Sequence, residues 1–318
     1  MCALFGWMDY AGKIPHKVLV RLTQALANAA EERGTDASGI SYVKDGRMTI
    51  YKRPKPAHKM RFHVPDGTSA VMGHTRFTTQ GDQRHNYNNH PFRGFAGCEF
   101  SFAHNGVLYN DKELRRMKKL PATKIETDSY VGVQLIEQSG DLSFDSLRNM
   151  AEDVSGNFTF TLLDAENSLY IIKGSSPMYL IHFEMLGIYV YASTHSIMEA
   201  ALKVCGLHRC QYDVIETEHG DILKIDCYGK ITRDHFHASS YDSFYSSWCY
   251  SMFDKKAESG TELDLIMEMC SCFGVEPEDV MELIDCGYTY DEIELFLMEP
   301  EEFCDEYQCI SERRQCYE

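Results

Sequence analysis

The sequence lacks several features that would assign it to a special class of protein. It has no run of about 18 apolar residues, the length that a membrane-spanning helix needs, and its N-terminus has no basic segment followed by an apolar one. It has no internal repeat, and no histidine follows His237. We therefore expect neither a membrane protein nor a repeat protein, and we predict a cytoplasmic location.

The composition that is present is ordinary for a globular protein. The 318 residues are 44% hydrophobic and 25% charged, and their number predicts one large domain with something smaller. Twelve cysteines in the cytoplasm are expected to be reduced thiols, which argues against a disulfide framework. Those from residue 249 onward lack the repeated C-x2-C spacing of zinc sites, so we expect helix-packing or exposed thiols, with zinc as the alternative.

The net charge of -17 belongs to the C-terminal part of the chain. Residues 257–318 hold 19 Asp plus Glu and only two arginines, whereas residues 1–256 hold 29 residues of each sign. Such an acidic segment argues against binding nucleic-acid phosphates. Together with a Ser- and aromatic-rich stretch before it, it predicts a main domain over 2–240, a linker over 241–258 and an acidic module over 259–318.

The main domain is predicted to be α+β, with antiparallel sheets. Helical spacing predicts helices near 16–33, 127–138 and 143–154, the last two opening with Thr or Ser. Asp45-Gly46 between two β-rich runs predicts a hairpin, and further hairpins are expected within 158–174, 178–194 and 219–233. The acidic module shows three short helical patterns, with Pro277 near one start, and predicts a three-helix bundle.

The chain opens MCALFGW, which places a cysteine directly after the initiator methionine. If the methionine is removed, Cys2 carries both a thiol and a free α-amine, whose reference pKa is about 8, so that one residue supplies a nucleophile and its base. Alternatively, Cys2 is a small apolar residue at the start of a buried strand. Four other stretches bear on this choice: RGTD at 33–36, GHTRFTTQGD at 73–82 with NNHPF at 88–92, FAHNGVLYN at 102–110 and ETDS at 126–129.

These five motifs, in this order, resemble the glutaminase domain of class II glutamine amidotransferases. That family is a branch of the N-terminal-nucleophile hydrolases and includes amidophosphoribosyltransferase, glucosamine-6-phosphate synthase and glutamate synthase. The resemblance covers about residues 2–230 and implies a four-layer αββα sandwich. It further implies hydrolysis of the side-chain amide of L-glutamine through a thioester on Cys2, with no metal or organic cofactor.

The resemblance also implies roles for individual residues. The Asn105 side chain and the Gly106 backbone N–H would hold the oxyanion, Arg76 the α-carboxylate and Asp128 the α-ammonium of glutamine. Phe77 and Thr79 would line the pocket, and Arg33 and Asp36 would support the N-terminal loop. Taken singly, each residue has a simpler interpretation: an Asn-Gly turn, a surface arginine, an aspartate in a first helical turn, a core phenylalanine and a strand threonine.

His74, His90 and His104 lie close to these motifs, and we interpret them as packed, hydrogen-bonded residues. The sequence departs from the usual family pattern at four positions: Ala3 for Gly, Thr35 for Pro, Phe77 for Trp and Gln80 for His. Ala3 is the most notable, because its Cβ narrows the backbone's options beside the site. These departures leave open a non-catalytic glutamine sensor or assembly subunit, or a related hydrolase with another amide substrate.

The ammonia acceptor is not expected in this chain. After residue 240 there is no Gly-rich phosphate loop, and too few residues follow for a sugar-phosphate, phosphoribosyl or adenylating domain. We therefore expect the acidic module to dock a separate synthase or acceptor protein, with a merely solvated acidic face as the alternative.

Overall fold

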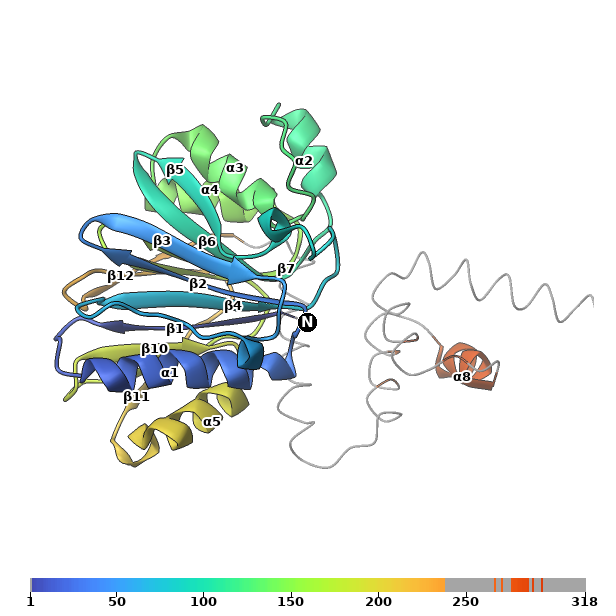
Figure 1. Ribbon diagram of the computed structural model, residues 1–318. Helices are drawn as coiled ribbons and strands as arrows, with labels where there is room; N and C mark the ends of the chain where they lie inside the picture. The colour runs from blue at the N-terminus through green and yellow to red at the C-terminus, as the bar shows by residue number, and fades with distance from the viewer. Residues whose placement is uncertain are drawn as a thin grey trace, which may run out of the picture. The chain divides into compact units, whose positions relative to one another are not determined.

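The computed structural model describes residues 2–237, 266, 270, 276–285, 288 and 293. The chain forms two compact units, Met1–Ser247 and Trp248–Glu318. In the first unit two antiparallel sheets carry the strands, and each sheet is covered on its outer face by helices (Figure 1). The predicted α+β class and four-layer αββα order are confirmed.

The first sheet has seven strands in the order β11-β9-β10-β1-β4-β2-β3. Their bounds are β1 Ala3–Asp9, β2 Ala37–Lys44, β3 Arg47–Arg53, β4 Ala70–Arg76, β9 Tyr179–Phe183, β10 Ile188–Ala192 and β11 Asp213–Ile215. The predicted hairpin joins β2 to β3, because Asp45 and Gly46 both adopt the positive φ that its turn requires.

The second sheet has six strands in the order β13-β12-β8-β7-β6-β5. Their bounds are β5 Phe92–Ala96, β6 Cys98–Leu108, β7 Gly156–Asp164, β8 Leu169–Lys173, β12 Asp221–Ile225 and β13 Ile231–His235. The three other predicted hairpins are confirmed as β7-β8, β9-β10 and β12-β13.

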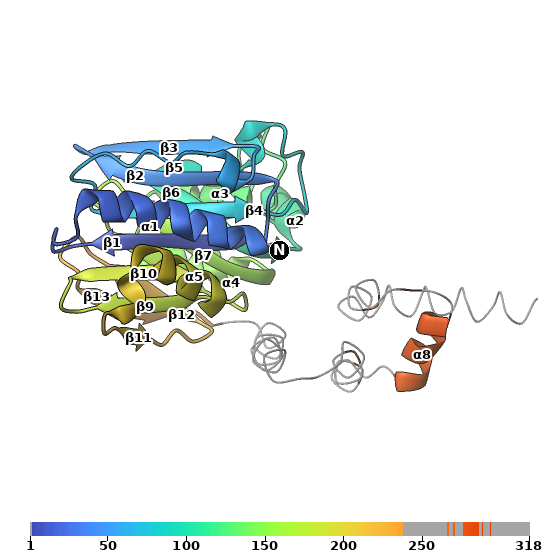
Figure 2. The same ribbon diagram turned by 60° about the horizontal axis from the view of Figure 1, so that its bottom comes forward.

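Helices α1 and α5 lie on the outer face of the first sheet, and α3 and α4 lie on that of the second (Figures 1 and 2). The α-helices of this unit are α1 His16–Ala29, α2 Asp111–Met117, α3 Tyr130–Ser139, α4 Phe144–Asp153 and α5 His195–Cys205. Short 3-10 turns are η1 Ala30–Glu32, η2 Ala57–Lys59, η3 Asn86–Asn88 and η4 Leu207–Arg209. The three predicted helices match α1, α3 and α4, whereas the prediction missed α2 and α5.

Three apolar clusters separate the layers. Ala3, Phe5 and Trp7 face the helices of the first sheet, whereas Leu4 and Met8 belong to the cluster between the two sheets. This alternation is the period-2 pattern of a strand that is buried on both faces. Because β1 is paired with β4 on one side and β10 on the other, its position in the first sheet is fixed by hydrogen bonds along both edges.

In the second unit, helix α8 covers Pro277–Asp285, beginning at the predicted proline, with Val280 and Leu283 buried. The predicted linker and most of the other two predicted helices lie outside the described residues. In the part of the chain that the structure describes, no helix combines the length and apolar character that crossing a membrane requires.

Trp7 joins the first sheet to α1 by a buried hydrogen bond, from its indole N–H to the Thr23 hydroxyl over 2.8 Å. We expect Thr23→Val to lower the free energy of unfolding by about 1–3 kcal/mol, because the indole N–H loses its partner without gaining water. When Trp7 is already replaced by Phe, the bond is absent, and Thr23→Val should then lower the free energy of unfolding by at least about 0.5 kcal/mol less than it does in the wild type. Urea unfolding measures these energies, and strict additivity would contradict the bond's contribution.

Candidate active site

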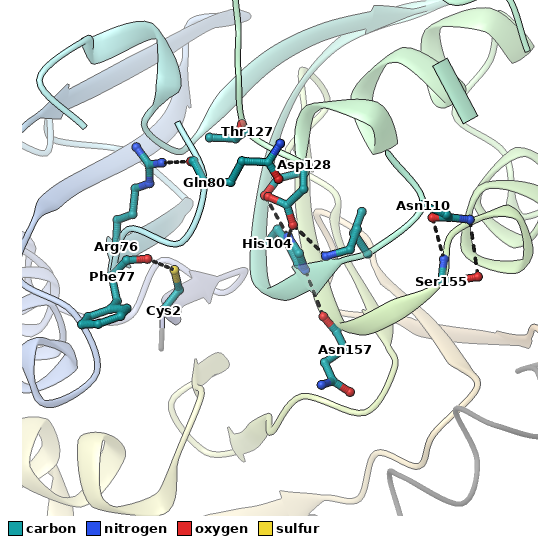
Figure 3. A network of polar contacts seen from close by, with 12 residues as sticks. Cys2, Arg76, Phe77, Gln80, His104, Asn110, Thr127, Asp128, Ser155 and Asn157 are labelled. Carbon is teal, nitrogen blue, oxygen red and sulfur yellow. Dashed lines mark hydrogen bonds and ion pairs between the residues drawn. The ribbon is translucent and has the colours of Figure 1, made fainter. Parts of the chain in front are cut away.

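The candidate nucleophile Cys2 lies where β1 begins and β4 ends. Ala3 is paired with Thr75, so Cys2 lies beside the chain that leaves β4 through Arg76 and Phe77. Its thiol donates to the Phe77 carbonyl over 3.4 Å, and the residue is 9% exposed (Figure 3). The position is therefore enclosed but directly next to the predicted carboxylate-binding arginine.

Burial raises the pKa of the Cys2 thiol above its ordinary value, while the hydrogen bond to Phe77 and the positive charge of Arg76 act against this rise. A thiol of this kind needs a base to become a good nucleophile. Ala3, which raised concern from sequence, lies in β1 and is not among the residues with positive φ, so its Cβ causes no backbone strain.

Arg33 and Asp36 contact the backbone on either side of this junction. The Arg33 Nε donates to the Cys2 carbonyl over 2.8 Å, and the Asp36 carboxylate accepts from the Thr78 N–H over 2.8 Å. Between them Gly34 packs so closely that a Cβ would lie 2.4 Å from the Arg76 carbonyl carbon. The motif thus touches both the N-terminal segment and the loop after β4, and its supporting role stays a prediction.

Arg76 is buried and held by the loop that follows it. One terminal nitrogen donates to the Asn89 side chain over 2.7 Å, and the other donates to the carbonyls of Gly81 and Gln80. Figure 3 shows the contact with Gln80. Burial lowers the pKa of Arg76, and the charges of Cys2 and Asp128 oppose that shift. The guanidinium is therefore held in one orientation near both groups, and Arg76 is not the surface residue that the alternative assumed.

Asn105 and Gly106 lie in β6, not in a tight turn, so the turn interpretation is wrong. The Asn105 amide donates to the buried hydroxyl of Ser193 over 3.3 Å, and the same hydroxyl accepts from the Leu4 N–H. Gly106 has φ +137°, and a Cβ there would lie 1.8 Å from the Asn157 carbonyl. Only glycine fits this position.

Asp128 is buried just before α3. Its Oδ2 accepts from the Leu108 N–H over 2.7 Å and lies 4.0 Å from the His104 Nδ1, while its Oδ1 accepts from the Ser129 hydroxyl (Figure 3). It also acts electrostatically on Cys2 and Arg76. The structure thus brings the two predicted charge partners of an amino-acid zwitterion to the same region as the thiol.

Phe77 and Thr79 follow β4 in the loop, so neither is a strand residue. Phe77 is 52% exposed, which rules out the interpretation as a core side chain, and Thr79 is also exposed. Both positions leave their side chains open to a ligand or to solvent. Their role in lining a pocket stays a prediction.

The histidines are buried, as expected. The His74 Nε2–H donates to the His104 carbonyl over 2.9 Å, and His104 contacts the Ser129 hydroxyl and the Asn157 carbonyl. His90 packs against His74 with ring centroids 4.2 Å apart, but neither of its ring nitrogens has a hydrogen-bond partner among the described residues. The predicted hydrogen bonding is therefore wrong for His90.

Three residues of the site were missed in the sequence. Ser193 bridges Asn105 and Leu4, Asn89 holds Arg76, and Lys52 donates to the carbonyls of Asn89 and Pro91. A signal existed only for Asn89, which lies in the NNHPF motif. Across the described residues, no group of three or more His, Cys, Asp or Glu side chains is placed to hold a metal ion.

Comparison with known proteins shows which families and structures this chain is similar to. Residues 74–200 match the family model described as "Glutamine amidotransferase domain", a range that includes Arg76, Asn105, Gly106 and Asp128. Glutamine–fructose-6-phosphate aminotransferase [isomerizing] of Staphylococcus aureus (strain Mu50) is 32% identical over 193 residues, which cover 57% of this chain and 30% of that protein. The Geobacillus kaustophilus enzyme of the same name is 28% identical over 186 residues, covering 56% and 30%.

Solved structures share the fold. The glutamine phosphoribosylpyrophosphate amidotransferase of B. subtilis complexed with ADP and GMP superposes with a TM-score of 0.56 at 20% identity, covering 75% of this chain and 50% of that one. A structure described as the allosteric regulatory enzyme of purine biosynthesis superposes with a TM-score of 0.57, at the same identity and coverage. Residues 74–200 are therefore similar to glutamine amidotransferase domains, and the relatives in sequence described above are named as enzymes. The chain spans 30% of the length of those curated relatives.

The buried histidines predict a loss of stability in acid. Burial lowers the pKa of His74 to about 3 and that of His90 well below its ordinary value. Because the unfolded chain protonates these rings near pH 6.5, it binds more protons than the folded chain below that pH. The free energy of unfolding should therefore fall as pH decreases from about 6.5, by up to about 1.4 kcal/mol per pH unit for each histidine.

Urea unfolding at several pH values between 4.5 and 7.5 measures this slope. We expect the free energy of unfolding of His74→Gln to depend less steeply on pH than that of the wild type, by up to about 1.4 kcal/mol per pH unit. An unchanged slope in His74→Gln would show that His74 does not titrate in this way.

Proposed function

We propose that this chain hydrolyses the side-chain amide of L-glutamine to glutamate and ammonia, with Cys2 as the N-terminal nucleophile. One observation carries the proposal: the buried thiol of Cys2 lies close enough to the oppositely charged side chains of Arg76 and Asp128 for both charges to shift its pKa. A zwitterionic amino acid matches that pair, and its side-chain amide would extend toward the thiol. The names of the sequence relatives support glutamine as the substrate.

The chemistry begins after removal of Met1, which exposes the α-amine of Cys2. The amine takes the thiol proton, the thiolate attacks the amide carbon, and the carbonyl electrons move to oxygen. The Asn105 amide and the Gly106 backbone N–H donate to that oxyanion, and losing one such donor typically slows a reaction by about 100- to 1000-fold. The carbon–nitrogen bond then breaks, and the leaving nitrogen takes the proton to depart as ammonia.

A thioester between Cys2 and the glutamyl group remains. Water, deprotonated by the same amine, attacks the thioester carbon, the carbon–sulfur bond breaks, and glutamate leaves with the thiol restored. Every proton that is removed returns to the leaving group or to sulfur. The scheme needs no metal and no organic cofactor.

The first test is an assay of glutamate and ammonia release from L-glutamine. The wild type should turn over, and Cys2→Ala should lose all measurable activity because the proposed thioester forms on the Cys2 sulfur. Cys227→Ala, at an exposed cysteine, is the matched control and should keep wild-type rates. Wild-type inactivity would favour a glutamine-sensing or assembly subunit, and equal turnover in Cys2→Ala would refute the proposed nucleophile.

We also propose that ammonia passes to a separate acceptor protein that docks on the acidic module. The proposal is supported by 19 acidic and two basic residues within 257–318, a charge density that attracts a basic surface in a salt-dependent manner. The division of the chain into two compact units is compatible with such a module. A cytoplasmic location stays a prediction.

The module's independence can be tested by truncation before residue 257. We expect kcat/KM for glutamine to stay within about twofold, because the residues proposed for catalysis all lie in the first unit. Circular dichroism before the assay checks that the shortened chain is folded. A truncated chain that unfolds or stops hydrolysing glutamine would make the segment an integral part of the enzyme.

A further inference from the structure

The side chain of Asn88 connects two segments that carry opposite charges of the site. It is fully buried at the end of η3, and both its Nδ2 and its Oδ1 form hydrogen bonds. Its Nδ2 donates to the Glu126 carboxylate over 2.7 Å and to the Asp82 carbonyl over 3.0 Å. Its Oδ1 accepts from the Glu126 backbone N–H over 3.0 Å.

On one side, Asn88 belongs to the loop that holds Arg76. The neighbouring Asn89 accepts from one terminal nitrogen of Arg76, and the carbonyls of Gln80 and Gly81 accept from the other. The bond from Asn88 to the Asp82 carbonyl closes this loop directly after Gly81. A displacement of Asn88 therefore moves the acceptors that orient the guanidinium.

On the other side, Glu126 lies two residues before Asp128. Two hydrogen bonds join Asn88 to Glu126, one accepted from the Glu126 backbone N–H and one donated to its carboxylate, and they fix the direction of this segment as it enters α3. Gly81 packs into the junction, where a Cβ would lie 3.1 Å from the Glu126 Cβ and 3.2 Å from the Asn88 Nδ2. The contact between the two segments is thus close as well as hydrogen-bonded.

We propose that Asn88 is a positioning residue that sets the separation between the Arg76 guanidinium and the Asp128 carboxylate. Through that separation it selects a free α-amino acid over amides that lack one of the two charged groups. The inference rests on the proposed glutaminase function. Aspartate cannot replace it because it lacks the donors, and an aliphatic side chain would leave the Glu126 N–H without the partner that Asn88 provides.

The experiment compares wild type and Asn88→Ala with three ligands. These are L-glutamine, 4-aminobutanamide, which lacks the α-carboxylate, and glutaramic acid, which lacks the α-ammonium. KM is measured for glutamine, and inhibition constants are measured for the other two. We expect Asn88→Ala to raise the KM for glutamine about tenfold with kcat within about threefold, because uniform binding is lost. The two inhibition constants should change less than twofold, since neither ligand uses both charges.

Two further variants guard against a general loss of structure. Asn88→Asp places a carboxylate against that of Glu126 and should raise the KM for glutamine at least as much as Asn88→Ala does. In Asn88→Asp/Glu126→Gln the new amide can donate to the new carboxylate, and the KM should be about threefold lower than in Asn88→Asp alone. Arg84→Ala removes an exposed ion pair with Asp82 in the same loop and should leave KM within twofold.

The outcomes separate the inference from the proposed function. An inactive wild type would contradict the glutaminase itself. An active wild type whose folded Asn88→Ala variant keeps both its KM and its preference for glutamine would overturn the positioning role of Asn88. An equal loss of affinity for all three ligands would overturn it too, since that is the effect of general damage to the pocket.

Discussion

The site depends on the register of β1 against β4. The pairing of Ala3 with Thr75 and of Leu4 with His74 places the residue before β1 next to the residues that end β4. A slip by one residue would exchange the two faces of β1, moving Trp7 from the helical layer to the space between the sheets. Large buried side chains on both faces of β1 therefore fix where the thiol of Cys2 lies.

The second constraint is that the charges of the site are buried but have partners. Arg76 is satisfied by a side-chain oxygen and two carbonyls of one loop, and Asp128 by a backbone N–H and a hydroxyl. Because Arg76 and Asp128 are each held by hydrogen bonds within a separate segment, their side chains do not need to form an ion pair with each other. Such a pair can receive a ligand that carries both signs.

The sequence was sufficient for the parts of the fold that depend on local chemistry. The turn at Asp45-Gly46 requires positive φ at both residues, and the capping box of Ser143 and Ser146 starts α4. Prediction was less complete where tertiary contacts decide. Ser129 precedes α3 without capping it, since its hydroxyl bonds to Asp128 and His104. Helix α5 was missed although Thr194 caps it and Gly206 ends it, both readable signals.

The candidate site followed the same division. Motif order was enough to name Cys2, Arg76, Asn105, Gly106 and Asp128, which the structure brings to one region. Asn88 lies in the NNHPF motif, but its bond to Glu126, 38 residues away, could not be assigned in this way, and neither could the bonds of Ser193, whose partners lie 88 and 189 residues away. Their contribution is visible only when both segments are in place.

The central claim is that Cys2, with its own free α-amine, is the nucleophile. It is tested most directly by treating the natively expressed protein with 6-diazo-5-oxo-L-norleucine, an electrophilic glutamine analogue, and mapping the product by peptide mass spectrometry. The account predicts one adduct per chain, on the thiol of an N-terminal peptide that begins at Cys2, with Met1 absent. An adduct on any other cysteine, or a modified peptide that still carries Met1, would contradict it.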